Sequence, residues 1–289
     1  MSSLKPYLQL TRPANLVTAI ADILAGMAIA QFTFSDFSPA LLVLSTLGLY
    51  GGGVVMNDVF DAKLDAVERP ERPIPSGKVP LAQAATMGIS LLLLGIIAAA
   101  AFNLQSGMIA VVIAMLTILY NRFAKHHVFF GPLVMGICRG GNLILGMSVL
   151  PESFQQWAFI AIFPIMYIGA ITLISQDEVH GGKKRTLYIA AFLYLAVLAA
   201  QLTIAQGKGN LLFTIPFVLL HAWFIFRPLW NAMQNPIGPL IGKAVKAGVI
   251  SLIVMNASWC AAFGLLPIAI AVLAFLPLSM YLAKAFAVT

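Results

Sequence analysis

The stretch PALLVLSTLGLYGGGVVMNDVFDAKLD, residues 39–65, joins an apolar segment to a cluster of acidic side chains. A helix needs about 20 residues to cross the hydrocarbon core of a bilayer, and residues 39–57 come close to that length. Asn57, Asp58, Asp61 and Asp65 follow where the segment meets water. At about 100° per residue, these four positions fall within roughly 100° of arc on one helical face. The stretch therefore predicts a membrane-spanning helix with carboxylates gathered at one end.

The composition of the whole chain is typical of a polytopic membrane protein. Of its 289 residues, 61% are hydrophobic and only 9% are charged, so we expect an all-α bundle of spanning helices that forms one domain over residues 1–289. The net charge of +7 arises mostly from cations in short connections between apolar segments. We therefore expect the lipid bilayer as a partner, and no nucleic acid. Cys138 and Cys260 lie inside apolar segments and are predicted to be small buried residues.

Apolar segments of nearly spanning length recur along the chain, and no connection between them is long enough to form a second domain. The ten predicted spans are 14–34, 39–57, 82–103, 106–120, 131–150, 156–175, 187–206, 211–227, 245–264 and 266–285. The last two meet at residues 264–267 and form either a hairpin or a broken helix. The longest connections are expected at 58–81 and 228–244, and both are rich in proline, which breaks regular structure.

The cationic residues favour one side of the membrane. With the N-terminus in the cytoplasm, 15 of the 17 lysines and arginines fall on the cytoplasmic side, whereas Lys208 falls on the other side and Arg139 lies within a span. Cytoplasmic connections of membrane proteins are enriched in lysine and arginine. The distribution therefore predicts that the N-terminus and the acidic cluster face the cytoplasm, in the cell membrane.

The acidic cluster suits a divalent cation. Carboxylates crowded on one face repel each other unless a cation joins them, and oxygen ligands without histidine or cysteine suit Mg²⁺, which commonly bridges carboxylates to phosphates. Arg69, Arg72 and Lys78 follow in a proline-rich loop, and Arg72 and Lys78 are candidates to bind diphosphate oxygens. The alternative is a solvated helix end whose carboxylates pair with neighbouring cations. The sequence predicts a metal–phosphate site at a membrane surface.

A second charged segment, SQDEVHGGKKRT, spans residues 175–186 at the end of the sixth predicted span. It lies on the same predicted side as the acidic cluster. Asp177 and Glu178 are candidates to hold a second ion, and the basic run that begins at Lys183 is a candidate to grip phosphate. The alternative is a flexible basic loop without a ligand.

Polar residues also interrupt or end the apolar segments. Tyr120 and Lys125 end the fourth predicted span and act either as an interfacial anchor or, if Lys125 reaches the pocket, as a phosphate site. Asp22 and Arg139 lie within spans and are expected to face the bundle interior, because exposure to lipid is costly. An ion pair between them would give these two residues a structural role.

Four stretches together resemble the UbiA superfamily of intramembrane prenyltransferases. They are Asn57-Asp58-x-x-Asp61-x-x-x-Asp65, Arg72-Pro73-Ile74-Pro75-Ser76-Gly77, Arg12-Pro13-x-Asn15, and Tyr120 through Lys125. The first two resemble the family's first aspartate-rich motif and its continuation. The resemblance covers the first nine predicted spans and leaves 266–285 as an extra C-terminal helix. Together with EVHGG at residues 178–182, the first motif is most similar to the EboC-like branch.

The resemblance implies a nine-helix bundle around a central cavity that opens to the cytoplasm, where Mg²⁺ and an isoprenyl diphosphate bind and the prenyl chain enters an apolar tunnel. Together with the reasoning above, it gives Asp58, Asp61, Asp65 and Lys125 as catalytic residues. The predicted metal ligands are Asn57, Asp58, Asp61, Asp65 and Asp177. The predicted substrate contacts are Asn15, Asn57, Arg72, Lys78, Tyr120, Asp177, Glu178 and Lys183.

The predicted activity is the Mg²⁺-dependent transfer of a prenyl group from an isoprenoid diphosphate to a hydrophobic acceptor. One departure favours a different class, a non-catalytic protein that binds isoprenoid lipid or assists its transport: residues 179–182 stand where the family has spaced carboxylates. The three aspartates of the first cluster disfavour that class, because lipid binding alone does not need them. A secondary transporter is disfavoured because its charged sites normally lie near the membrane midplane.

Overall fold

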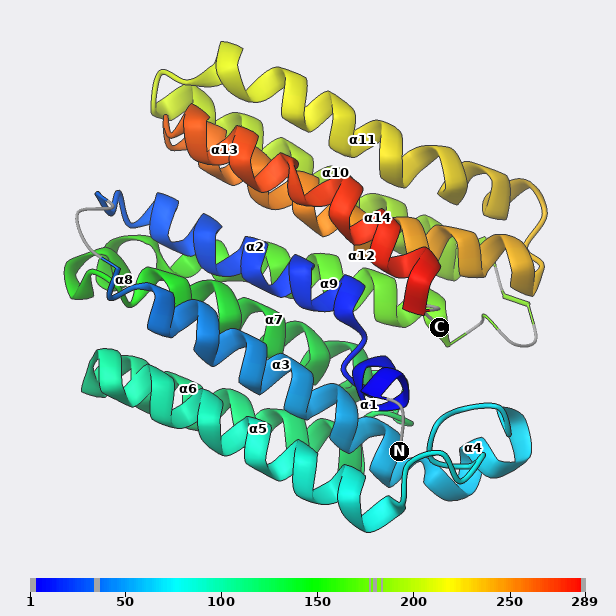
Figure 1. The fold of residues 1–289 in the computed structure, drawn as a ribbon. Helices are drawn as coiled ribbons and strands as arrows, with labels where there is room; N and C mark the ends of the chain where they lie inside the picture. The colour runs from blue at the N-terminus through cyan, green and yellow to red at the C-terminus, as the bar shows by residue number, and fades with distance from the viewer. Residues whose placement is uncertain (1–3, 34–36, 177, 179–180, 183, 287–289) are drawn as a thin grey trace.

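The computed structural model describes residues 4–33, 37–176, 178, 181–182 and 184–286, and these fold into a bundle of helices (Figure 1). The elements in chain order are α1 (Leu4–Leu10), α2 (Pro13–Ile29), α3 (Ala40–Phe60), α4 (Ala62–Glu68), α5 (Leu81–Phe102), α6 (Leu104–Leu119), the π-helix η1 (Tyr120–Ala124), α7 (Phe130–Met147), α8 (Pro151–Trp157), the 3₁₀ helix η2 (Ala158–Ala161), α9 (Ile162–Ser175), α10 (Lys184–Gly207), α11 (Leu211–Gln234), α12 (Gly238–Ala262), α13 (Leu266–Leu273) and α14 (Phe275–Phe286).

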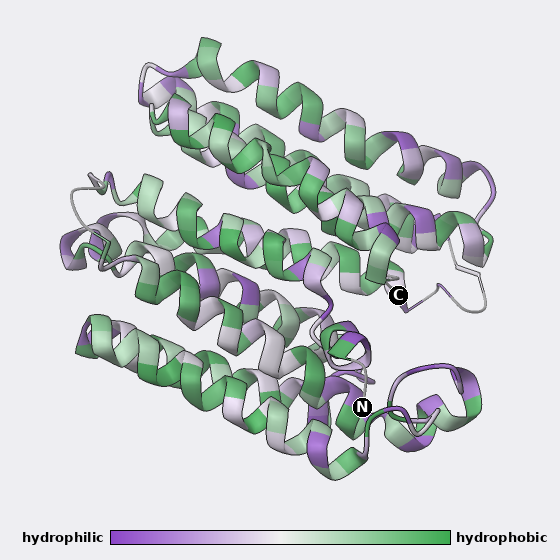
Figure 2. Cartoon of the chain, viewed as in Figure 1, coloured by the Kyte–Doolittle hydropathy of each residue, from purple (hydrophilic) through white to green (hydrophobic). Residues whose placement is uncertain are grey.

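Within the described residues, nine helices or joined helical segments are long and apolar enough to cross a membrane, or up to ten when α1 and α2, bent by 48°, count as one span. Each predicted span falls on one of them, so the chain is an integral, multi-pass membrane protein. Hydrophilic residues gather at the helix ends and connections, whereas the helices between them are mostly hydrophobic (Figure 2).

The predicted connection at 228–244 is wrong. The helix α11 continues through Pro228 to Gln234, and α12 begins at Gly238, so only a few residues separate them. A proline removes one backbone hydrogen bond, but spanning helices tolerate it where neighbouring groups satisfy the freed backbone atoms. The last two predicted spans form a hairpin rather than one broken helix, because the chain turns at Gly264, whose φ is +83°.

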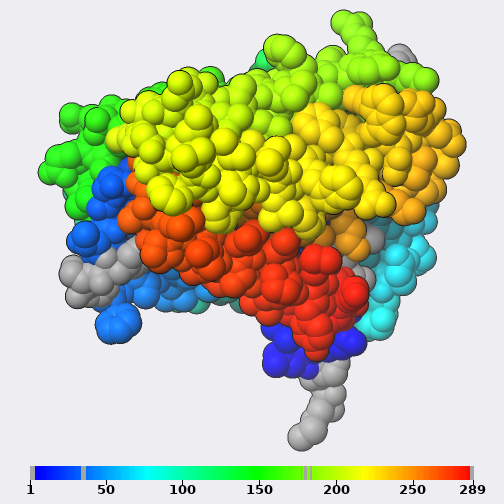
Figure 3. Space-filling view, turned by 90° about the horizontal axis from the view of Figure 1, so that it is seen from above, coloured from blue at the N-terminus to red at the C-terminus, as the bar shows by residue number. Residues whose placement is uncertain are grey.

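Two apolar cores share the central helices α2 and α7. One core combines them with helices from the second half of the chain, α9 to α13, and the other with α3, α5 and α6. The joined helices α13 and α14 lie against α12 and α2, and with α11 they cover one face of the molecule (Figure 3). This arrangement leaves α2, α3 and α7 facing one another in the middle of the bundle.

Glycines set the spacing of two helix pairs that shape the interior. A Cβ atom on Gly52 of α3 would lie 2.8 Å from the backbone oxygen of Gly88 in α5. On α2, a Cβ atom on Gly26 would lie 2.3 Å from the backbone oxygen of Leu143 in α7. Small residues allow such close approach of helices in membranes, so these glycines fix α3 against α5 and α2 against α7.

Candidate functional site

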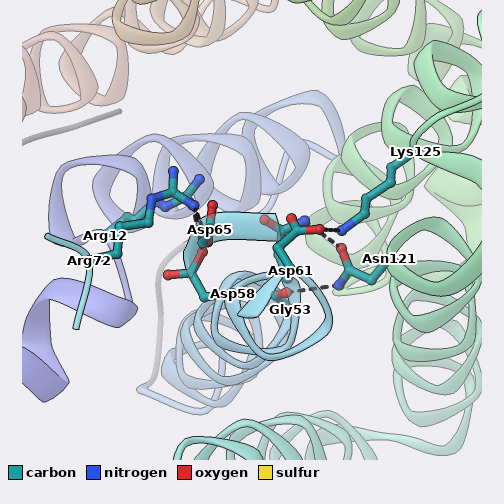
Figure 4. Close-up of polar contacts among 9 residues, drawn as sticks. Arg12, Gly53, Asp58, Asp61, Asp65, Arg72, Asn121 and Lys125 are labelled. Carbon is teal, nitrogen blue, oxygen red and sulfur yellow. Dashed lines mark hydrogen bonds and ion pairs between the residues drawn. The ribbon is translucent and has the colours of Figure 1, made fainter. Parts of the chain in front are cut away.

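The acidic cluster lies at one end of the bundle, which we call the charged end because Arg12, Asp58, Asp61, Arg72 and Lys125 meet there (Figure 4). The helix α3 ends at Phe60, one residue before Asp61, and α4 begins directly after it. The charged end lies beside α1 (Figure 1).

The aspartates divide between two sets of cationic partners. Asp58 lies 2.9 Å from Arg12 and 3.5 Å from Arg72, and Asp65 lies 2.8 Å from the same Arg72. Asp61 instead pairs with Lys125 on the other side of the cluster (Figure 4). Asp58 and Asp65 are buried, and a buried carboxylate is costly without a cationic partner. The ion pairs with Arg12 and Arg72 therefore neutralise these buried carboxylates.

Arg12 reaches Asp58 from the break between α1 and α2. Its backbone is in the left-handed region, with φ of 48° and ψ of 70°, and Pro13 begins α2 directly after it. Residues other than glycine rarely adopt this conformation, and strained positions are concentrated at functional sites. The break turns the guanidinium toward the end of α3.

Asn121 lies in η1, the π-helical continuation of α6, and Lys125 follows the last residue of η1 directly. A π-helical turn changes the facing of the residues that follow it and is frequent at functional sites. The buried Asn121 donates a hydrogen bond of 3.0 Å to the backbone oxygen of Gly53 and accepts one of 3.0 Å from Asn57. Asn121 thus ties η1 to the charged end of α3 and orients the Asn57 amide.

A cavity of about 310 Å³ extends inward from this end. Arg12, Asn15, Asn57 and Tyr120 line it on the side of the charged end, whereas Thr46 lies eleven residues earlier than Asn57 on α3 and lines its deep part. At about 1.5 Å per residue, that separation corresponds to roughly 16 Å of depth. The remaining wall is largely apolar and includes Leu49, Ile113, Met135, Ile168, Ile171, Val249 and Leu252.

The structure brings most of the predicted site residues together. Asn15, Asn57 and Tyr120 line the cavity, and Asp58, Asp61, Asp65, Arg72 and Lys125 form the ion pairs at the charged end. Lys78 is exposed, and no ion pair joins it to another described residue. Glu178 is also exposed. Its carboxylate lies close to α12, because a Cβ atom added to Gly242 would be 2.7 Å from it. Asp177 and Lys183 lie outside the described residues.

The carboxylates do not converge on one point. Among the described residues, no group of three or more histidine, cysteine, aspartate or glutamate side chains is close enough to hold a metal ion. The predicted common helical face is interrupted at Asp61, where α3 ends, and the partners on either side separate the carboxylates. The metal-ligand roles of Asn57, Asp58, Asp61, Asp65 and Asp177 stay predictions.

The predicted interior pair is confirmed. The carboxylate of Asp22 lies 2.6 Å from the Nε atom of Arg139, and both side chains are buried between α2 and α7. Arg139 also lines the cavity. Sequence reasoning assigned no site role to Arg139, Arg12 or Asn121. The sequence held three signals that could have suggested such roles. Arg139 is a charge within a span, Arg12 belongs to the Arg-Pro motif, and Asn121 follows Tyr120 directly.

Residues 19–237 match the UbiA prenyltransferase family. A digeranylgeranylglyceryl phosphate synthase of Methanothermobacter thermautotrophicus is 32% identical over 85% of this chain and 92% of its own length. The synthase of the same name from Saccharolobus solfataricus is 31% identical, over 60% of this chain and 61% of its own length. The solved structure of a UbiA homologue from Archaeoglobus fulgidus bound to GPP and Mg²⁺ has a TM-score of 0.63 and 16% identity, over 86% of this chain and 99% of that one.

The chain is therefore a membrane-embedded helical protein of the prenyltransferase class, and it belongs to the UbiA prenyltransferase family. The resemblance to the EboC-like branch stays a prediction.

Proposed function

We propose that this protein transfers a prenyl group from an isoprenyl diphosphate to a hydrophobic acceptor within the membrane, and that it uses Mg²⁺. The observation that carries the proposal is the set of ion pairs between three aspartates and Arg12, Arg72 and Lys125 beside a largely apolar cavity. The cationic side chains suit a diphosphate, and the cavity suits a prenyl chain.

The donor atoms at the charged end are of the chemical type that binds Mg²⁺, although the ion pairs hold the carboxylates apart. Asp58, Asp61 and Asp65 offer hard oxygen ligands, with the amide of Asn57 beside them, and such ligands suit Mg²⁺. The homologue from Archaeoglobus fulgidus that was solved with GPP and Mg²⁺ supports the same assignment. When bound, Mg²⁺ would neutralise negative charge on the diphosphate.

Arg72 and Lys125 would hold the diphosphate and stabilise the charge that develops as it leaves. The bond between C1 of the prenyl group and the bridging oxygen breaks, and its electron pair departs with the diphosphate. Charge-assisted hydrogen bonds from guanidinium and ammonium groups are strong and favour this separation. The apolar wall excludes water from the allylic cation, the acceptor bonds to C1, and the acceptor then loses a proton.

We further propose that the charged end faces the cytoplasm and that the protein lies in the cell membrane. The cationic residues Lys63, Arg69, Arg72 and Lys78 accompany the acidic cluster at this end, whereas Lys208 lies in the connection after α10. Lysine and arginine favour the cytoplasmic side of spanning helices.

The test uses purified protein in lipid nanodiscs with labelled isoprenyl diphosphates of several chain lengths and an extract of membrane lipids. We expect release of diphosphate and a labelled product with Mg²⁺, and neither after chelation. Asp61→Asn should abolish both, whereas Glu68→Gln, which alters an exposed carboxylate on α4, should leave both intact. Binding of the diphosphate without release under any condition would refute transfer and favour a lipid-binding role.

A further inference from the structure

The deep part of the cavity has a polar wall inside an otherwise apolar bundle. Arg139 and Asn142 of α7 line it together with Thr46 and Tyr50 of α3. Arg139 lies midway along a spanning helix, and polar or charged residues at such depth are costly and commonly functional. The close approach of α2 and α7 at their glycines places Asp22 beside Arg139.

Asp22 is fully engaged by three side chains from two neighbouring helices, α7 and α12. Its Oδ1 atom accepts a hydrogen bond of 2.7 Å from Asn256 of α12, and its Oδ2 atom accepts one of 3.0 Å from Asn142. The same Oδ2 atom lies 2.6 Å from Nε of Arg139. These contacts fix the carboxylate, so it cannot turn toward a ligand.

The guanidinium of Arg139 keeps at least one hydrogen-bond donor without a partner in the protein. A guanidinium carries five N–H groups. Nε lies 2.6 Å from Oδ2 of Asp22, an ion pair without hydrogen-bond geometry, and Nη2 donates a hydrogen bond of 2.7 Å to the backbone oxygen of Thr18. Nη1 has no hydrogen-bond partner among the described residues. This atom is not fully enclosed by protein. Because Arg139 forms part of the cavity wall, and its guanidinium lies 5.7 Å from the ring centre of Tyr50, this nitrogen can donate to a ligand.

The cavity offers this donor without net positive charge. Among its lining residues, only Arg12 and Arg139 carry a full charge, and each has a carboxylate within ion-pair distance, Asp58 and Asp22 respectively. A ligand carboxylate placed beside Arg139 would be a buried anion without a counterion of its own, which is strongly unfavourable. An uncharged oxygen would accept the hydrogen bond from Nη1 without that cost.

We propose that Arg139 and its neutralising partner Asp22 determine acceptor specificity: they select an acceptor that carries an uncharged hydroxyl or carbonyl oxygen at its inner end and reject one with a carboxylate there. Tyr50 lies seven residues before Asn57, about 10 Å deeper along α3. An acceptor anchored at Arg139 therefore directs its other end, with the reacting atom, toward the charged end. This inference rests on the proposed function.

The test compares two probes of the same shape, 4-hydroxybenzyl alcohol and 4-hydroxybenzoate, at a pH where the second is ionised. Cys138 lines the cavity, whereas Cys260 is buried. A probe bound in the cavity should therefore slow the modification of Cys138 by methyl methanethiosulfonate, and mass spectrometry measures the rate of this modification. We expect the alcohol to protect Cys138 at a concentration lower by about tenfold or more, the range for an unmatched buried charge. Equal or better protection by the carboxylate, or protection by neither probe, would overturn the proposal.

A change at Asp22, the counterion of Arg139, tests whether charge sets the preference for the uncharged probe. Asp22→Asn leaves Arg139 without its counterion and should reverse the preference in favour of the carboxylate. Glu152→Gln removes an exposed carboxylate from α8 and should leave the preference unchanged. An unchanged preference in folded Asp22→Asn protein would refute the role of charge, and the comparison on the unaltered protein stands even if this variant fails to fold. The protection of Cys138 does not require turnover. If the protein releases diphosphate but the carboxylate probe protects Cys138 as well as the alcohol does, this inference is refuted and the proposed function is not.

Discussion

Replacement of Lys125 by methionine should move two affinities in opposite directions. The ammonium of Lys125 pairs with Asp61, and the two side chains are only 10% and 16% exposed. Methionine keeps a similar length and removes the charge. Because one charge-assisted hydrogen bond to a phosphate oxygen contributes about 1.5–3 kcal/mol, we expect the Kd for an isoprenyl diphosphate in the presence of Mg²⁺ to rise by about 10- to 150-fold.

The same change should strengthen the binding of Mg²⁺ alone, because Asp61 loses the cation that competes for it. Titration calorimetry in nanodiscs measures both affinities, with a non-reactive thiolo-diphosphate analogue as the ligand. Lys63→Met, an exposed lysine on α4, is the matched control and should change neither affinity. Unaltered binding of the analogue to Lys125→Met would show that Lys125 only balances Asp61 and would refute its assignment to the diphosphate.

Three further outcomes are expected. Asn121→Leu removes both of its 3.0 Å hydrogen bonds to α3, and at about 0.6–1 kcal/mol each it should lower the free energy of unfolding by about 1–2 kcal/mol, measured as a lower Tm in detergent. Gly52→Ala forces a Cβ atom to within 2.8 Å of a backbone oxygen of α5 and should cost about 1–3 kcal/mol, whereas Gly207→Ala, with nothing within 4 Å, should not. A bound isoprenyl diphosphate should slow thiol labelling at Cys138, and Cys260 should stay unlabelled in either state; faster or unchanged labelling of Cys138 would place the prenyl chain elsewhere.

The spans were predictable because a membrane imposes a simple length and composition on every helix that crosses it. The errors fell where that constraint is weak. Pro228 led to a predicted end at residue 227, but α11 continues to Gln234, because one lost backbone hydrogen bond does not end a helix that its neighbours support. The pairing of Asp22 with Arg139 was anticipated for the same energetic reason, since neither charge is tolerated alone in the bundle interior.

The composition of the charged end was predictable, but its internal pairing was not. Helical spacing placed Asp58, Asp61 and Asp65 on one face, yet Asp61 pairs with Lys125, which lies 64 positions away in the chain. That contact depends on the π-helical turn after α6, and the contact between Arg12 and Asp58 depends on a left-handed backbone at residue 12. Neither local conformation has a dependable signature in a single sequence, because tertiary contacts stabilise both.

Under the proposed assignment, the ion pairs of the charged end make the binding of metal and substrate interdependent. Mg²⁺ alone must take Asp58 and Asp61 from the cations that neutralise them, and a diphosphate alone must take Arg72 and Lys125 from their carboxylates. When both ligands bind, Mg²⁺ takes the carboxylates and the diphosphate takes Arg72 and Lys125. Each ligand therefore spares the other the free-energy cost of leaving charged side chains unpaired. Linkage then requires each to raise the affinity of the other by the same factor. A protein with its carboxylates already neutralised in this way resists binding stray divalent ions and forms its metal site together with its substrate.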